Sequence, residues 1–197
     1  METHILGGRV LVVENVFEPR EYDLVSQEIA HLRQYIVPTY HGSDVVLYRT
    51  ILDELYQDRK RSYILQVLPE KLYGPKVLET CEQIHDLSYT LVNKQHKFTT
   101  ALTEMRSDTD YRTHTDTGDG VHWTQIFMSW ILYINPQPEL FTDGDLIVED
   151  LNLTVGPKNN RLVLLPAYLN HRITPAVYRD DAGSYYRTTL NGFLTLK

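Results

Sequence analysis

The sequence predicts an α+β fold in which a jelly roll (a double-stranded β-helix) carries N-terminal helices packed on its outside. Helical periodicity appears only before about residue 96. Short runs rich in Val, Ile, Leu, Thr and Tyr follow it. Clusters of Gly, Pro, Asn and Asp separate those runs, as turns between antiparallel strands do. Helices followed by a dense set of such strands are typical of α+β proteins, and a double-sheet jelly roll is the specific arrangement we expect.

The chain has 197 residues, a length that suits one compact domain. It contains no internal repeat, low-complexity tract or linker. We therefore expect a single domain over residues 1–197, with a helical support region at about 1–96 and the jelly-roll core at about 97–197.

The first elements follow from local patterns. Arg9–Glu14 is a β-branched run and predicts a strand. An amphipathic helix is expected after Pro19, which suits a first helical turn, and Pro38 ends its pattern. The apolar positions of this helix fall on one face of a 3.6-residue period. They are Val25, Ile29, Leu32 and Ile36.

Two further helices are expected before residue 96. One begins after Gly74-Pro75, and the other lies within Ile51–Leu68, where charged residues interrupt its polar face. Cys81 falls inside the apolar stripe of the helix after Pro75, so core packing explains it. That stripe consists of Val77, Cys81, Ile84, Ser88 and Leu91.

The strands expected after residue 96 come in an order that allows antiparallel pairing. Asp181-Ala182-Gly183 has the composition of a turn, and we expect it to join the last two strands in a long hairpin. The predicted strands are Phe98–Met105, Trp123–Ile134, Asp145–Glu149, Arg161–Leu165, His171–Val177 and Tyr185–Leu196.

Composition excludes several classes of protein. The formal net charge is −7 and the pI is near 5.6, which argues against a nucleic-acid binder. A single cysteine, Cys81, excludes an internal disulfide framework and a zinc site of the CxxC kind. Such cysteine usage fits a reducing, cytoplasmic compartment. Neither a signal-peptide run nor an apolar stretch of membrane-spanning length is present, so no membrane partner is expected.

Three residues could share a metal ion. His114 and Asp116 are two apart, and such residues on a strand point to the same face. A second histidine, His171, stands in a later predicted strand. Two histidines and one carboxylate form a facial triad, which leaves positions on iron open for further ligands. The triad predicts a metal centre at His114, Asp116 and His171.

An arginine in the last predicted strand fits a second ligand. Arg187 stands between Tyr186 and Thr188, where an arginine would otherwise face a hydrophobic neighbourhood. Its guanidinium can bind a carboxylate through two parallel hydrogen bonds. The sequence therefore pairs a metal centre with a candidate carboxylate anchor.

These motifs together resemble the prolyl-4-hydroxylase-like branch of the 2-oxoglutarate/iron(II) oxygenases, over roughly residues 98–196. The departures are Met105, where that family commonly has a tyrosine, a Gly-Gly pair reduced to Gly144, and a longer gap between His171 and Arg187. The matching segments are Tyr111-Arg112-Thr113-His114-Thr115-Asp116, Leu132-Tyr133-Ile134-Asn135, Asp143-Gly144-Asp145, Arg161-Leu162-Val163-Leu164-Leu165-Pro166 and Arg187-Thr188-Thr189-Leu190-Asn191-Gly192-Phe193.

The resemblance implies a dioxygenase that hydroxylates an unactivated C–H bond while it decarboxylates 2-oxoglutarate to succinate. Iron(II) would be bound by His114, Asp116 and His171. Arg187 would pair with the 5-carboxylate of 2-oxoglutarate, with Tyr133 and Thr189 as further hydrogen-bonding candidates. Related halogenases lack the carboxylate ligand, so Asp116 favours hydroxylation. Molecular oxygen is the second cosubstrate, and the resemblance also allows ascorbate as a reductant.

Two other classes of protein are open. One is a cupin-like metal-dependent oxygenase or isomerase that does not use 2-oxoglutarate, against which Arg187 argues. The other is an interaction protein without catalysis, which has no need of the triad. The substrate is equally open between a prolyl or other amino-acid residue of a peptide, a free amino acid and a small metabolite.

A reactive centre of this kind needs cover from water until substrate arrives. Thr39–Asp44 and Thr117–Thr124 have the glycine content of a covering loop. The second stretch directly follows Asp116, so we expect Asp119, His122 and Trp123 to lie near the open face of the metal.

Overall fold

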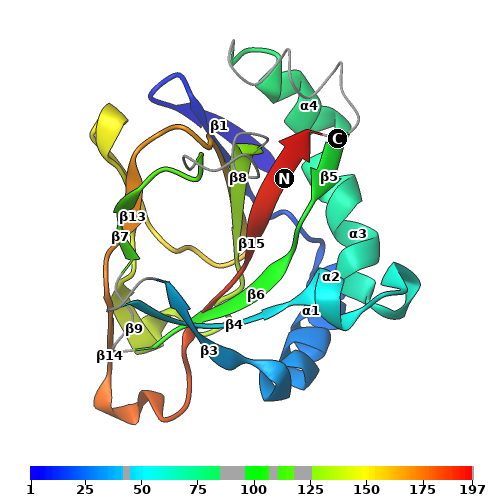
Figure 1. The fold of residues 1–197 in the computed structure, drawn as a ribbon, viewed down its shortest axis with the longest axis vertical. Coiled ribbons are helices and arrows are strands. Elements are labelled where there is room, and N and C mark those ends of the chain that lie inside the picture. Colours follow the sequence, from blue (N-terminus) through cyan, green and yellow to red (C-terminus); the bar gives the residue numbers. More distant parts are fainter. Residues whose placement is uncertain (42–44, 85–95, 107–110, 118–125, 197) are drawn as a thin grey trace.

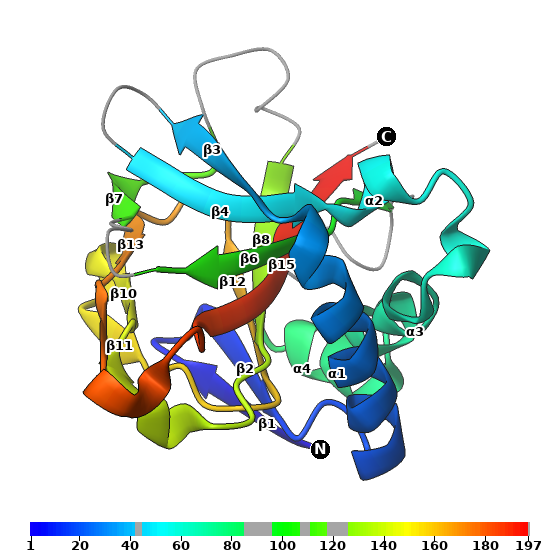
Figure 2. The same cartoon turned by 90° about the horizontal axis from the view of Figure 1, so that it is seen from below.

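The computed structural model describes residues 1–41, 45–84, 96–106, 111–117 and 126–196. It has the predicted α+β architecture (Figure 1): two antiparallel sheets face each other, and helices from the first half of the chain cover one of them. Figure 2 shows the three layers side by side, with the large sheet between the helices and the small sheet. No helix in these ranges is long and apolar enough to cross a membrane.

The large sheet is antiparallel throughout, with a short strand, β5 (His96–Phe98), paired to β15. Its other strands, in spatial order, are β1 (Glu2–Leu6), β2 (Val10–Glu14), β12 (Arg161–Pro166), β8 (Ile126–Tyr133), β15 (Arg187–Leu196), β6 (Ala101–Met105), β4 (Val45–Ile51) and β3 (Val37–His41).

The small sheet faces one side of the large sheet. Its strands, in spatial order, are β11 (Leu153–Val155), β10 (Leu146–Val148), β13 (His171–Ile173) and β7 (Tyr111–His114). A separate pair, β14 (Ala176–Tyr178) with β9 (Phe141–Asp143), extends the structure beyond β10 and β13. The order of these strands is that of the predicted jelly roll.

The helices are α1 (Pro19–Leu32), α2 (Leu52–Leu55), α3 (Tyr63–Leu72) and α4 (Pro75–Cys81). Glu18 caps α1 reciprocally with Glu21, and α1 buries Val25, Ile29 and Leu32. These apolar side chains pack with every second residue of β8, including Trp130 and Leu132, in the larger core cluster. The other residues of β8 point to the opposite face, where Ile131 and Tyr133 join a second cluster between the two sheets.

One helix prediction in the first third was wrong, and another placed the end of a confirmed helix four residues too late. The helix after Pro19 ends at Leu32 rather than Ile36, because the chain must become extended before Pro38, and a 3₁₀ turn at Arg33–Tyr35 leads into β3. The region predicted as one helix over Ile51–Leu68 contains the end of β4, α2, a 3₁₀ turn and α3. The first 96 residues therefore supply strands of the large sheet as well as helices. Of the apolar stripe predicted after Pro75, Ser88 and Leu91 lie outside the described residues.

The predicted hairpin near the C-terminus was also wrong. The run His171–Val177 divides into β13 and β14 at Thr174-Pro175, because proline has no N–H to continue a ladder. β14 then pairs with β9 rather than with β15. A 3₁₀ turn at Asp180–Ala182, followed by Gly183 at a φ of +59°, carries the chain to β15. The long gap between His171 and Arg187 is taken up by this detour.

Candidate active site

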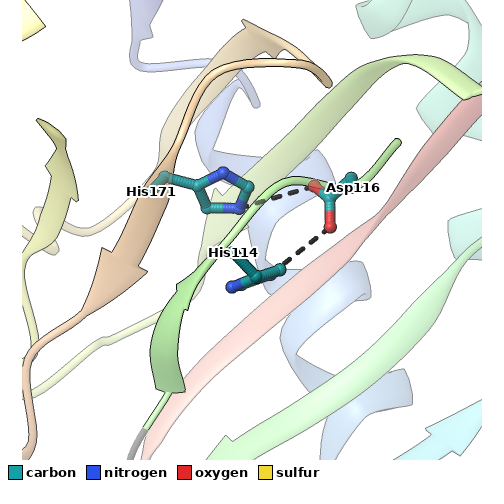
Figure 3. Close-up of side chains that lie close together, drawn as sticks. All are labelled: His114, Asp116 and His171. Atoms are coloured by element: carbon teal, nitrogen blue, oxygen red, sulfur yellow. Dashed lines mark ion pairs between the residues drawn. The ribbon is translucent and has the colours of Figure 1, made fainter. Parts of the chain in front are cut away.

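His114, Asp116 and His171 converge at one end of the space between the two sheets (Figure 3). His114 Nε2 lies 3.4 Å from Asp116 Oδ1, and His171 Nε2 lies 3.4 Å from Asp116 Oδ2. The three candidate ligand atoms lie within 4.8 Å of one another. The carboxylate thus faces both rings from one side, with one oxygen directed to each.

The pairing of two strands brings the histidines together. His114 on β7 is the direct partner of His171 on β13, and their ring centroids are 4.5 Å apart. Asp116 does not lie on the strand as predicted, because β7 ends at His114. Its backbone N–H instead donates to the carbonyl of Ala167 at 2.9 Å, which fixes the turn that directs the carboxylate at both rings.

Hydrogen bonds define the orientation of both rings. His114 Nδ1 lies 2.8 Å from the carbonyl oxygen of Arg112, and His171 Nδ1 lies 2.9 Å from that of Leu169. A carbonyl only accepts, so Nδ1 carries the proton in each ring. Nε2 is left with its lone pair directed into the triad, which is the tautomer that a metal ligand requires.

The electrostatics differ between the two histidines. Burial lowers the pKa of His171, and this outweighs the charge of Asp116. Burial also opposes the charged form of His114, but hydrogen bonds to Asp116 and to the Arg112 carbonyl raise its pKa above the ordinary value. Burial favours the neutral form of Asp116, but the His114 hydrogen bond, the charge of His171 and the Ser129 hydrogen bond together lower its pKa. The carboxylate is therefore ionised at neutral pH.

Ser129 is a functional candidate that the sequence analysis missed. Its hydroxyl donates to Asp116 Oδ2 from the facing strand β8, and it is 4% exposed. A bond of this kind holds a carboxylate ligand in place. The signal in the sequence was a single serine between Met128 and Trp130 in a strand of apolar and aromatic residues.

A cavity of about 700 Å³, part of it open to solvent, joins the triad to Arg187. Arg187 projects from β15 and is 2% exposed. Among the described residues, no hydrogen-bond partner contacts its Nε or Nη2. A buried guanidinium with unsatisfied donors is costly unless an anion completes it, so this arginine is suited to a carboxylate ligand.

Packing holds the guanidinium in place. The ring of Tyr133 lies beneath it, with 4.9 Å between the ring centroid and Arg187 Cζ. On another side, Gly144 adopts a φ of +74°, and a Cβ there would stand 2.7 Å from Arg187 Cδ. Gly144, the one glycine present where the resembled family often has two, thus makes room for Arg187.

The other two predicted cosubstrate residues are placed differently. Thr189 lines the cavity beside Arg187 and is 4% exposed. Tyr133 is fully buried and does not belong to the described residues that line the cavity, although its hydroxyl has no well-formed hydrogen bond among them. Met105, where a tyrosine is expected, lines the cavity as a buried side chain. Of the predicted covering segments, residues 42–44 and 118–124, with Asp119, His122 and Trp123, lie outside the described residues.

The donor set fits iron(II). Two neutral imidazoles and one carboxylate on one side of an ion leave the opposite side open, which is the arrangement of non-haem iron oxygenases. The carbonyl-bound Nδ1 atoms and the Ser129 hydroxyl supply the outer hydrogen bonds that such ligands need. The unsatisfied guanidinium in the same cavity fits the distal carboxylate of 2-oxoglutarate.

No protein-family model matches the sequence, and no curated protein matches it significantly. Solved structures do match in fold. A prolyl-4-hydroxylase from Pseudomonas putida aligns with a TM-score of 0.61 at 17% identity, over 95% of this chain and 92% of the other. A Trichoplax adhaerens prolyl hydroxylase, in complex with a peptide fragment of the hypoxia inducible factor oxygen degradation domain, aligns with a TM-score of 0.65 at 15% identity, over 95% and 84%.

A third match is the viral collagen prolyl hydroxylase of Paramecium bursaria Chlorella virus-1 in complex with 2-oxoglutarate. It aligns with a TM-score of 0.56 at 12% identity, over 96% of this chain and 97% of the other. These matches agree with the resemblance inferred from the motifs. The chain therefore has the fold of the prolyl 4-hydroxylases among the 2-oxoglutarate/iron(II) oxygenases, and it presents a two-histidine, one-carboxylate triad at His114, Asp116 and His171.

Proposed function

We propose that this protein is an iron(II)- and 2-oxoglutarate-dependent dioxygenase that hydroxylates an unactivated C–H bond and releases succinate. The observation that carries the proposal is one cavity that joins the triad to a buried arginine with unsatisfied donors. The cupin-like alternative has no use for such an arginine, because its chemistry needs no dicarboxylate anchor.

Each residue has a defined role in the proposal. His114, Asp116 and His171 would hold iron(II), while Ser129 keeps the carboxylate in its orientation. Arg187 would bind the 5-carboxylate of 2-oxoglutarate, and Thr189 on the same strand would add a hydrogen bond. When bound together, iron(II) and 2-oxoglutarate supply the activation of molecular oxygen that C–H hydroxylation requires.

Burial gives the anchor its selectivity. In the buried end of the cavity, a carboxylate that reaches Arg187 exchanges water for two charge-assisted hydrogen bonds. A ligand without that carboxylate leaves the guanidinium unpaired, which costs several kcal/mol. Tyr133 supports the guanidinium from below through its ring. The site therefore distinguishes 2-oxoglutarate from shorter oxo acids by the length between its two carboxylates.

The substrate proposed at this level is a prolyl or other amino-acid residue. The structural matches support it. The Trichoplax adhaerens prolyl hydroxylase was solved in complex with a peptide fragment, and the viral match is a collagen prolyl hydroxylase. Ascorbate as a reductant and a cytoplasmic location belong to the same proposal. The buried, unpaired thiol of Cys81 is consistent with a reducing compartment.

Anaerobic titration tests the function directly. Iron(II) and 2-oxoglutarate added to the metal-free protein should together produce a visible metal-to-ligand charge-transfer band, which neither produces alone. Succinate serves as the control, because it carries both carboxylates but no keto oxygen to complete the chelate. Stoichiometric iron(II) binding without such a band on addition of 2-oxoglutarate would refute the proposal and favour the cupin-like alternative.

A further inference from the structure

A second guanidinium shares the cavity. Arg49 on β4 lines it together with the triad, and the side chain is half-buried. The register places Arg49 opposite Thr103 on β6, and Thr103 opposite Thr189 on β15. Two strand spacings of about 4.8 Å therefore separate Arg49 from the strand that carries the cosubstrate anchor. Arg49 and Arg187 occupy different sides of one cavity floor.

Tyr111 lines the same cavity as Arg49. The Tyr111 ring in turn lies 4.9 Å from the ring of His114. Arg49 thus shares the cavity with the residue whose ring lies against one of the histidines.

The guanidinium of Arg49 has no protein counter-ion within the described ranges. No carboxylate there forms an ion pair with it, and the one acid that lines the described part of the cavity is Asp116. Asn191 adds a second donor on the same floor. Its Oδ1 accepts from Thr103 Oγ1 at 2.8 Å, which directs its amide N–H group away from Thr103. This part of the cavity thus offers a guanidinium and an amide N–H group as donors.

Charge balance leads to the same conclusion. With iron(II) and the 2-oxoglutarate dianion bound, Asp116 and Arg187 neutralise the two ligands between them. Arg49 is then the charge left over, on a half-buried side chain that lines the cavity. A half-buried cation without a counter-ion attracts an incoming anion.

We propose that Arg49, with the amide of Asn191, binds a carboxylate of the substrate and so selects acidic substrates. The inference rests on the proposed function, because it assumes that Arg187 is occupied by 2-oxoglutarate. The carboxylate positions the neighbouring C–H bond over the open face of the metal. A substrate whose carboxylate is masked as an amide loses both the ion pair with Arg49 and the positioning of its C–H bond over the metal.

Two sources of that carboxylate fit the structure. A free amino acid supplies its α-carboxylate, and a peptide supplies a C-terminus or an acidic side chain. Arg49 also borders a second, shallower hollow of about 820 Å³ at the β3–β4 edge, lined by Val37 and Leu55 among others. A peptide could continue into that hollow, whereas a free amino acid would leave it empty.

The test uses the anaerobic complex with iron(II) and 2-oxoglutarate. Phenylglyoxal modification of Arg49 is followed by peptide mass spectrometry in the presence of free amino acids and short peptides, each as acid and as amide. At least one acid should slow the modification about tenfold relative to its amide. Protection by free amino acids identifies the first source of the carboxylate, and protection by peptides alone identifies the second. Equal modification with every acid and its amide overturns the proposal.

Variants give an independent readout. Arg49→Gln should weaken the binding of the protective acid about 10- to 100-fold, the loss expected for a charged hydrogen bond. It should leave 2-oxoglutarate affinity, measured by the charge-transfer band, within about twofold. Arg172→Gln is the matched control, since Arg172 pairs with Glu149 outside the cavity at 3.0 Å.

The outcomes separate the two proposals. Failure of the charge-transfer band in the wild-type protein refutes the oxygenase assignment, whatever Arg49 does. A normal band with no difference between Arg49→Gln and Arg172→Gln toward acids refutes only the role of Arg49. Loss of 2-oxoglutarate affinity in Arg49→Gln would assign Arg49 to the cosubstrate and likewise overturn the inference.

Discussion

The two faces of the large sheet have opposite chemistry, and β15 shows it along a single strand. On the helix side, Leu190 and Leu194 are fully buried in the larger core cluster. On the other side, Arg187, Thr189 and Asn191 line the cavity. Neighbouring residues thus belong either to the packed core or to the ligand site, and the period of two along a strand assigns them.

The comparison shows how the site can carry unsatisfied groups. The helix-covered face is filled by apolar side chains of α1, α3 and α4, which supply burial without any ligand. The cavity face can then keep Arg187, whose Nε and Nη2 have no hydrogen-bond partner among the described residues. Substitutions on the first face should change stability, and substitutions on the second should change binding.

The largest effect is expected at the triad. His171→Ala removes one of three ligands, so iron(II) affinity should fall by more than the roughly 10- to 100-fold that loss of an outer-shell partner costs. Because His171 is not part of the helix-side core, the melting temperature of the metal-free protein should change little. Equilibrium dialysis and calorimetry measure the two quantities, with His31→Ala on the exposed face of α1 as the control. Full iron occupancy in His171→Ala would refute the assignment.

The second-largest effect is expected at Arg187, the proposed anchor for 2-oxoglutarate. Arg187→Ala would leave the 5-carboxylate of bound 2-oxoglutarate unpaired, and its binding should weaken by about 3–5 kcal/mol with iron still bound. Arg187→Lys should recover part of this, because a point charge still pairs without the two-pronged geometry. The charge-transfer titration gives both affinities. If 2-oxoglutarate bound Arg187→Ala as it binds the wild type, the anchor would have to lie elsewhere in the cavity.

On the opposite face, Leu190→Ala should reduce the free energy of unfolding by about 2–5 kcal/mol, the cost of a cavity in a packed core. Thr189→Ala, one residue away on the cavity face, should cost much less stability and instead weaken 2-oxoglutarate binding. Urea denaturation of the two metal-free variants makes the comparison. Equal loss of stability in both variants would show that the cavity face contributes as much to the free energy of unfolding as the helix-covered face does.

The smallest effect concerns the ion pair between Glu14 on β2 and Arg161 on β12. Burial favours neutral Glu14, but hydrogen bonding and the charge of Arg161, at 2.6 Å, together with Lys158, lower its pKa below the ordinary 4.5. A lowered folded-state pKa means that this contribution is present above pH 4.5 and is lost as the pH falls through the folded value. Glu14→Gln should therefore cost on the order of 1.5 kcal/mol at pH 7, and the difference from wild type should shrink in acid. Urea midpoints between pH 7 and pH 3 test this, and a difference independent of pH would contradict it.

The sequence predicted the site better than its surroundings. His114, Asp116 and His171 could be predicted as a cluster because a metal site needs specific residue types, and the structure brings them together. The role of Arg187 as an anchor stays a prediction. Ser129 and Arg49 were missed because a lone serine or arginine has no motif. Their roles depend on pairing across strands far apart in the chain, such as β4 with β6.

The missed fold features have physical causes of the same kind. β3 and β4 lie in a stretch where charged residues and tyrosines hide the alternation, and their pairing at the sheet edge decides their conformation. The hairpin expected at Asp181-Ala182-Gly183 failed because turn composition does not specify the partner of a strand. β14 pairs with β9, and the Tyr178 hydroxyl donates to the carbonyl of Met105 and accepts from the Arg187 N–H.

Gly144 has a consequence for how this protein can change over generations. Any side chain there must adopt a backbone conformation that suits glycine and must also displace the stem of Arg187. Such a variant would keep the triad intact and would move Arg187, the proposed cosubstrate anchor, out of position. A side chain at position 144 therefore requires a compensating change at position 187, so the two positions constrain each other.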